Sequence, residues 1–233
     1  MQPHYIVPIL STHWILGILL TALLYAALLW TGKLALQKGF ELKFRYLLVG
    51  LFIIREVYLY AYIIQEGQFT LQDSLPLHLC NISYIFLILF LLRPNYFLFE
   101  FLIMLSLAGA IQSFVTPELT HGYSPYFMLD YYFSHGAIIF APLYGLFIFG
   151  MRPRTRSWLR VFIFGNAVLL FVYLINLLLD SNYIYLMRAP EADNPLILHP
   201  YPMHLVGFQI FGLLHILLIY WISRKIKIEP THH

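Results

Sequence analysis

Long apolar runs recur along this chain, and they restrict it to very few folds. A helix needs about 20 consecutive apolar residues to cross the hydrocarbon core of a bilayer, and its backbone polar groups are then satisfied within the segment. The 233 residues are 61% hydrophobic and 11% charged, with a mean hydropathy of +0.75. Soluble domains carry roughly 25% charged residues. The sequence therefore predicts an all-α, polytopic membrane protein.

Seven segments have the length and hydropathy of membrane spans, and together they predict one transmembrane domain over residues 1–233. The expected spans are 12–30, 46–64, 74–92, 96–116, 130–150, 158–179 and 203–222. The connections between them are too short for a separate soluble domain, so any chemistry must take place inside a seven-helix bundle. The start of the chain lacks the basic region of a signal peptide, and we expect the first span to be retained.

The basic residues predict the orientation of this bundle, because Lys and Arg gather on the cytoplasmic side of a membrane protein. Of the 14 basic residues, all but two follow the first, third, fifth and seventh spans: Lys33, Lys38, Lys43, Arg45, Arg93, Arg152, Arg154, Arg156, Arg160, Arg224, Lys225 and Lys227. We therefore predict an outside amino terminus and a cytoplasmic carboxyl terminus. The net charge of +3 gives no indication of a nucleic-acid partner.

Polar residues inside the predicted spans are candidates for function, since unpartnered polar groups are costly in lipid. At a rise of ~1.5 Å per residue, Cys80 would lie about 9 Å below the start of its span and His135 about 8 Å below the start of another. A thiol and a nearby imidazole can form a nucleophile and its base. Further candidates at the same level, for binding, orienting or steadying an oxyanion, are His78, Asn81, Gln112, Asn182 and His204.

Each of these residues also has a structural interpretation. A lone cysteine such as Cys80 is often a small apolar filler, and His135 could hydrogen-bond across helices. Arg55 and Glu56 place charge inside the second span. Because adjacent residues on a helix do not face each other, we expect these two charges to need different partners.

Several motifs resemble those of a known family. They are Leu75-Pro-Leu-His-Leu-Cys-Asn-Ile-Ser83, Thr116-Pro117, His135-Gly136 with Ala141-Pro142-Leu143-Tyr144, and Asn182-Tyr-Ile-Tyr-Leu186 with Pro190. In this order they resemble the YwaF family of bacterial integral membrane proteins, which is similar to a eukaryotic transmembrane acyltransferase that makes polyunsaturated ether phospholipids. The resemblance implies a multi-pass protein of the bacterial cytoplasmic membrane that acts on a membrane phospholipid without a cofactor. It also implies that Cys80 and His135 correspond to the catalytic residues of that enzyme, with His78 a competitor for the base.

These observations favour an intramembrane lipid acyltransferase or lipid hydrolase that forms a cysteine acyl-enzyme with a histidine base. One alternative is a zinc-dependent seven-helix lipid hydrolase, for which His78, His135 and His204 would be the metal ligands. Another is a transporter or sensor without enzymatic activity, in which Arg55 and Glu56 line a path through the membrane.

Overall fold

The computed structural model of the chain describes residues 4–190 and 201–226, and most of its regular structure is helical. The helices are α1 (Thr12–Gln37), α2 (Glu41–Gln65), α3 (Leu79–Leu92), α4 (Tyr96–Phe101), α5 (Leu107–Val115), α6 (Pro125–Phe147), α7 (Ser157–Leu179) and α8 (Met203–Lys225). A π-helical segment, η1 (Leu102–Ser106), joins α4 to α5, and η2 (Tyr183–Tyr185) is a 3-10 turn. The short strands β1 (Tyr5–Ile6) and β2 (Glu118–Leu119) pair antiparallel, with Tyr5 opposite Leu119.

Five segments of the described chain have the length and hydropathy to cross a membrane: α1, α2, the continuous segment Tyr96–Val115, α7 and α8. These helices confirm the prediction of a multi-pass helical membrane protein. Helix α3 is apolar but shorter, and α6 is not among the five. The count of seven crossings and the positions of the two termini relative to the membrane stay predictions.

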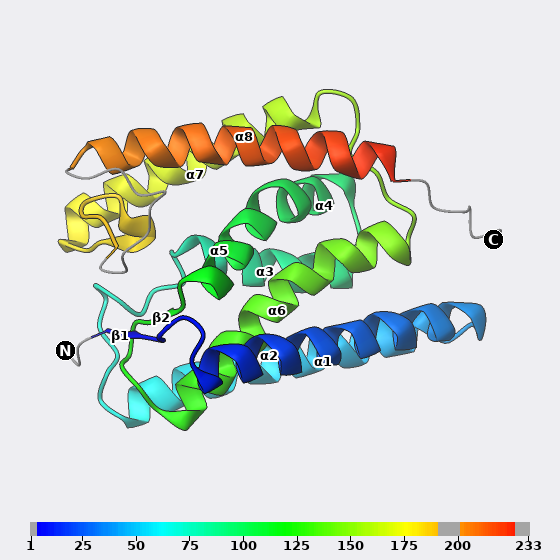
Figure 1. Cartoon of the computed structure of the whole chain (residues 1–233), viewed down its shortest axis with the longest axis horizontal. Helices are drawn as coiled ribbons and strands as arrows, with labels where there is room; N and C mark the ends of the chain where they lie inside the picture. Colours follow the sequence, from blue (N-terminus) through cyan, green and yellow to red (C-terminus); the bar gives the residue numbers. More distant parts are fainter. Residues whose placement is uncertain (1–3, 191–200, 227–233) are drawn as a thin grey trace.

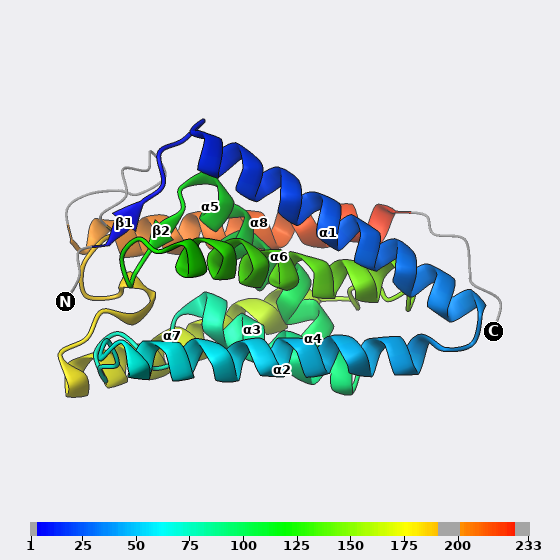
Figure 2. The same cartoon turned by 90° about the horizontal axis from the view of Figure 1, so that it is seen from below.

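Helix α6 lies at the centre of the bundle, with α1 and α2 on one side and α7 and α8 on the other (Figures 1 and 2). It packs against α1, α3, α5 and η1. Two close approaches bring α1 and α6 together: a Cβ at Gly17 would lie 2.4 Å from the Tyr132 ring, and one at Gly136 would lie 2.4 Å from the Tyr25 ring. Because protein surrounds α6, its polar side chains are screened from lipid.

Helix α3 begins at Leu79, later than the expected span 74–92. The residues before it form turns, and Pro76 among them has no N–H to donate to a helix. As a result Cys80 lies in the first turn of α3, whereas the sequence placed it well inside a helix. Helix α6 begins at Pro125, ahead of the expected 130–150, because Ser124 caps it by accepting a hydrogen bond from a backbone N–H.

The segment before α3 is held by the loop that follows α7. The hydroxyl of Tyr183 donates to the carbonyl of Leu71 at 2.9 Å and accepts from the backbone N–H of Leu75 at 2.8 Å. The amide of Asn176, at the end of α7, in turn donates to the carbonyl of Tyr183 at 2.9 Å. Tyr183 and Asn176 are both fully buried. This buried polar contact fixes where α3 begins and therefore where Cys80 lies.

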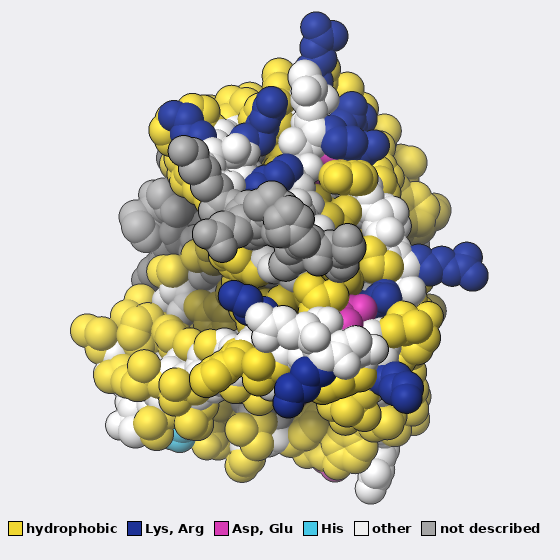
Figure 3. Space-filling view, turned by 90° about the vertical axis from the view of Figure 1, so that its right-hand side faces the viewer, with side chains coloured by type: hydrophobic (Ala, Val, Ile, Leu, Met, Phe, Trp, Pro, Cys, Tyr) yellow, Lys and Arg dark blue, Asp and Glu magenta, His cyan; other side chains and the backbone are white. Residues whose placement is uncertain are grey.

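The two ends of the bundle differ in charge. Figure 3 shows Lys and Arg side chains gathered at the end where α1, α6 and α8 finish. We call this the basic end; its exposed residues are Lys33, Lys38, Lys43, Arg93, Arg154, Arg156, Arg160, Arg224 and Lys225. Lys227 lies outside the described residues. The opposite end, where β1 and β2 lie, is called the strand end below (Figure 1).

Candidate functional site

A cavity of about 980 Å³ lies within the bundle, and it brings together polar residues from six helices. Arg55 of α2, Cys80 of α3, Ser113 of α5 and His135 of α6 all line it, and α7 and α8 complete its wall. At the strand end it is lined by Asp73, Glu118 and His121. Its size falls within the range of small-molecule sites, about 300–1,000 Å³.

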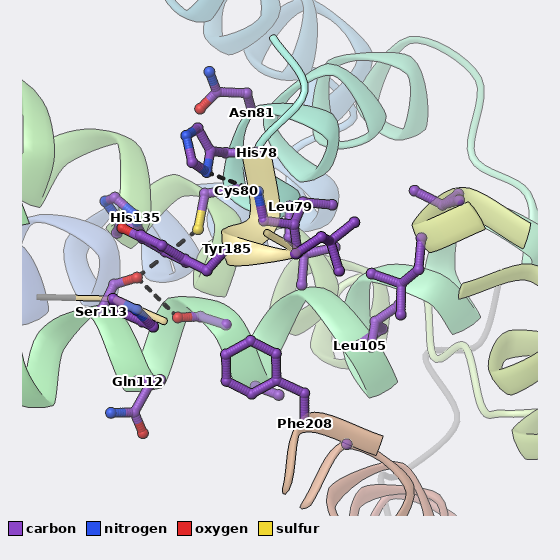
Figure 4. Close-up of a pocket in the computed structure, with 18 of the residues that line it drawn as sticks. His78, Leu79, Cys80, Asn81, Leu105, Gln112, Ser113, His135, Tyr185 and Phe208 are labelled. Carbon is purple, nitrogen blue, oxygen red and sulfur yellow. Dashed lines mark hydrogen bonds between the residues drawn. The ribbon is translucent and has the colours of Figure 1, made fainter. Parts of the chain in front are cut away.

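Cys80 lies in the first turn of α3 and is partly buried against the core. Its Sγ lies 3.8 Å from the Oγ of Ser113 on α5, and Figure 4 shows the sulfur directed toward that hydroxyl. The Ser113 hydroxyl donates its single hydrogen to the carbonyl of Gly109 at 2.9 Å. The Cys80 thiol is therefore the donor to Ser113, which accepts with a remaining lone pair.

His135 faces the same cavity from α6, and its ring lies beside Cys80 and Ser113 in Figure 4. Its Nδ1 lies 2.7 Å from the carbonyl of Tyr131, and the two rings are 4.2 Å apart between centroids. A carbonyl can only accept, so Nδ1 carries the hydrogen of this bond. In the neutral ring Nε2 is then left with a free lone pair, which makes it the basic nitrogen.

Tyr131 also connects α6 to Ser113, the neighbour of Cys80. Its hydroxyl donates to the backbone carbonyl of Ser113 at 2.9 Å. One tyrosine thus contacts the residue that orients Cys80 and, through its carbonyl, orients His135. The sequence did not single out Ser113 or Tyr131; Ser113 follows Gln112 on an ordinary apolar helix, and Tyr131 is one of 18 tyrosines.

His78 lines the cavity at the start of α3 but uses its ring differently. Its Nδ1 accepts a hydrogen bond from the backbone N–H of Ile184 at 3.3 Å, and its ring packs against those of Tyr183 and Tyr185. Since Nδ1 accepts, the neutral ring carries its hydrogen on Nε2. His78 therefore fastens the loop after α7 to the start of α3.

The other predicted site residues divide between the cavity and its surroundings. Asn81 and Gln112 line the cavity, but Figure 4 shows both side chains directed away from the Cys80 sulfur. Gln112 donates instead to the hydroxyl of Thr116 at 3.2 Å. Asn182 accepts from backbone N–H groups in its own loop, and buried His204 bonds the carbonyl of Tyr185; neither lines the cavity.

The intramembrane charges form one network on the cavity wall. The Arg55 guanidinium binds both carboxylate oxygens of Asp130, with 2.6 Å between Nε and Oδ1, and its Nη1 lies 2.6 Å from Oε2 of Glu56. The expectation that Arg55 and Glu56 need different partners is wrong, because the long Arg55 side chain folds back to reach its neighbour. Arg55 also lies over the ring of Tyr84, 4.7 Å from its centroid. Asp130 is the main partner of Arg55, and the sequence indicated it only as the start of a span.

His121 belongs to the loop between α5 and α6 at the strand end of the cavity. The centroid of its ring lies 5.4 Å from that of Phe127, and the residue is half-buried. Burial lowers the pKa of the imidazole, and this effect outweighs the opposing attraction of Asp73. His121 is therefore neutral in the folded protein at pH 7.

Among the described residues, no three His, Cys, Asp or Glu side chains are grouped so that they could hold a metal ion. His204, one of the three ligands expected for zinc, is engaged with Tyr185 outside the cavity wall. The zinc alternative therefore finds no ligand set in this part of the chain.

Comparison with known proteins places the chain in a family. The TMEM164 family model matches residues 9–220, which include every cavity residue named above. The chain belongs to the TMEM164 family. Membership of the TMEM164 family agrees with the apolar helices, and the YwaF name stays a prediction from the motifs. No curated protein and no solved structure matches the chain.

Proposed function

We propose that the protein is an intramembrane enzyme that transfers or hydrolyses the acyl chains of membrane phospholipids through a Cys80 acyl-thioester. The observation that carries this proposal is one shared cavity. A thiol from α3 and an imidazole with a free Nε2 from α6 both line it, and most of the other lining residues are apolar. Cysteine nucleophiles are activated by a base that takes the thiol proton, and both side chains face this one cavity.

His135 serves as the base in this proposal, and His78 does not. The bond from Nδ1 of His135 to the Tyr131 carbonyl leaves its Nε2 lone pair free to take a proton. In His78 the corresponding lone pair is on Nδ1, which already accepts from the Ile184 N–H. Releasing it would detach the loop after α7 from the start of α3.

The start of α3 supplies donors for the oxyanion. The first backbone N–H groups of a helix have no intrahelical acceptor, and those of Cys80 and Asn81 fall within this turn. The N-cap residue, His78, makes no side-chain capping bond to them. They can therefore donate to a negative oxygen that forms next to Sγ.

The proposed reaction has two halves. In the first, Nε2 of His135 takes the thiol proton, Sγ attacks the ester carbonyl, and the oxyanion collapses to release the lysophospholipid, whose alkoxide receives the proton from His135. In the second, His135 deprotonates an acceptor hydroxyl or water, which attacks the Cys80 thioester. The thiolate leaves and recovers the proton, so the enzyme returns to its starting state.

The remaining parts of the proposal concern the membrane. We infer seven crossings in a bacterial cytoplasmic membrane. Because the exposed Lys and Arg residues gather at the basic end, we infer an outside amino terminus and a cytoplasmic carboxyl terminus. In this orientation the strand end faces outward, and the phospholipid reaches the cavity from the outer leaflet. The YwaF resemblance supports a phospholipid as the substrate.

The test is the intact mass of the purified protein after incubation with phospholipid vesicles, before and after treatment with neutral hydroxylamine. We expect an acyl-sized, hydroxylamine-labile adduct that maps to Cys80. It should be absent from Cys80→Ala and should form far more slowly in His135→Ala. The variant His13→Ala is the matched control, because it removes an exposed imidazole that does not line the cavity.

The control separates chemistry from folding. Equal adduct yields in His135→Ala and His13→Ala would remove His135 from the mechanism. An adduct on a lysine, or none with any vesicle composition, would remove the thioester mechanism itself. Thermal unfolding of each variant in detergent shows whether a loss of adduct reflects a loss of fold.

A further inference from the structure

The cavity does not end at the catalytic candidates but continues into an apolar arm between η1, α7 and α8. Leu105 of η1, Val161 and Gly165 of α7, and Gly212 and Ile216 of α8 line this arm, and α7 and α8 also bring three polar side chains to the cavity: Asn166, Gln209 and His215. Figure 4 shows Leu105 well beyond Cys80, with Leu79 between them and Phe208 on the α8 side. The arm is therefore continuous with the space beside the thiol.

One end of the arm is closed and one side of it is open. Val161 and Ile216 are 4% and 2% exposed, so they form a packed floor. Leu170, Phe211 and Leu214 also line the cavity, yet they are 62%, 39% and 57% exposed on the apolar outer surface of α7 and α8. In a membrane this side opens onto hydrocarbon and not onto water.

Two glycines give the arm its width. A Cβ added at Gly212 would meet no atom within 4 Å, so the cavity itself occupies the space beside this position. A Cβ added at Gly165 would lie 3.0 Å from Cδ2 of Leu105, so these two residues lie close together on the wall of the arm. The π-helical turn of η1 carries Leu105, and such turns are frequent at functional sites.

We propose that this arm holds the acyl chain of the phospholipid, and that Leu105, Gly165 and Gly212 determine the length and bulk of the chain that is accepted. The inference rests on the proposed function, since the arm leads from Cys80. An apolar, closed-ended space that opens sideways to lipid is filled by hydrocarbon in preference to water or a polar ligand. The acyl chain attached to a Cys80 thioester would extend into it.

The test is a competition among phosphatidylcholines that differ only in acyl-chain length, read as the distribution of adduct masses on Cys80. We expect Gly212→Phe and Gly165→Leu to shift the distribution toward shorter chains and Leu105→Ala to shift it toward longer ones. The acyl chain enters the arm from bilayer hydrocarbon, which is as apolar as the arm, so selection by chain length comes from steric fit and not from transfer out of water.

Gly50→Phe is the matched control. Gly50 is also a helical glycine with nothing within 4 Å of an added Cβ, but it does not line the cavity. It should leave the chain-length distribution unchanged. An adduct that forms with the same distribution in the wild type and in all three arm variants would overturn the inference while leaving the thioester mechanism intact.

A second measurement covers the case in which no adduct forms. Cys80→Ala protein is irradiated with a phosphatidylcholine that carries a diazirine at the end of its acyl chain, and the labelled peptides are mapped. Labelling of the peptides that contain Leu105, Gly165 or Gly212, reduced in Gly212→Phe but not in Gly50→Phe, supports the chain site even if the proposed chemistry fails. Labelling that avoids these peptides would overturn the inference whatever the chemistry.

Discussion

Arg55 is the cation of an ion network whose other members are Glu56 and Asp130, and its removal should be far more damaging than neutralisation of Glu56. The side chains of Arg55, Glu56 and Asp130 are 15%, 22% and 9% exposed. Replacing Arg55 by Leu would leave two carboxylates close together with no cation between them. Replacing Glu56 by Gln would leave the Arg55–Asp130 pair neutral and intact.

The loss of unfolding free energy in Arg55→Leu follows from the low exposure of the three side chains and from the bonds that Arg55 makes. Breaking a buried ion pair by removing one partner costs about 3–5 kcal/mol, and Arg55→Leu removes the partner of two carboxylates. For a chain of this size, that corresponds to a fall in Tm of roughly 6–20 °C, at about 2–4 °C per kcal/mol. The triple variant Arg55→Leu/Glu56→Gln/Asp130→Asn removes all three charges and should recover most of this loss, because a neutral cluster leaves no unpaired charge.

The measurement is thermal unfolding of the variants in the same detergent. Arg93→Leu is the matched control, since Arg93 is an exposed arginine after α3 and the same substitution there should cost less than about 0.5 kcal/mol. If Arg55→Leu unfolds at the same temperature as Arg93→Leu, or if the triple variant is less stable than Arg55→Leu alone, the network does not act as argued.

Three further predictions concern the loop, the helix packing and the pH dependence. Tyr183→Phe removes a hydroxyl that bonds two backbone groups before α3, so it should cost about 1–3 kcal/mol in thermal unfolding and lower the adduct yield at Cys80. Gly136→Val would force its Cβ into the Tyr25 ring and should cost about 1–3 kcal/mol, whereas Gly50→Val should cost less. Burial lowers the pKa of His121, so the stability that its neutral ring contributes is present above about pH 6.5 and is lost as the pH falls below it. His121→Phe should therefore flatten the fall in Tm between about pH 6.5 and 5, and an unchanged pH profile would contradict this assignment.

The sequence alone determined the class of the protein. Apolar length is a local property, so the spans 12–30 and 158–179 were visible without any tertiary contact, and α1 and α7 include them. Because polar groups are costly in lipid, the sequence also indicated Cys80, His135 and Arg55 as candidates for function. All three line the cavity.

Tertiary structure decided how these residues meet. The start of α3 at Leu79 depends on Tyr183, which lies more than a hundred positions along the chain and bonds the segment before it. No local pattern indicates such a bond, because a buried tyrosine and a membrane-interface tyrosine look the same in the sequence. The roles of Ser113 and Tyr131 likewise come from the contact between α5 and α6.

Tertiary packing also determined the Arg55–Asp130 ion pair and the shape of the cavity. Arg55 of α2 reaches Asp130 of α6 only because the tertiary fold brings the two residues together, and their separation in the sequence carries no signal of that pairing. The apolar arm depends on what α7 and α8 leave unfilled beside Gly212 and η1. Hydrophobicity determines which segments enter the membrane, but only the packing of one helix against another determines where space remains for a ligand.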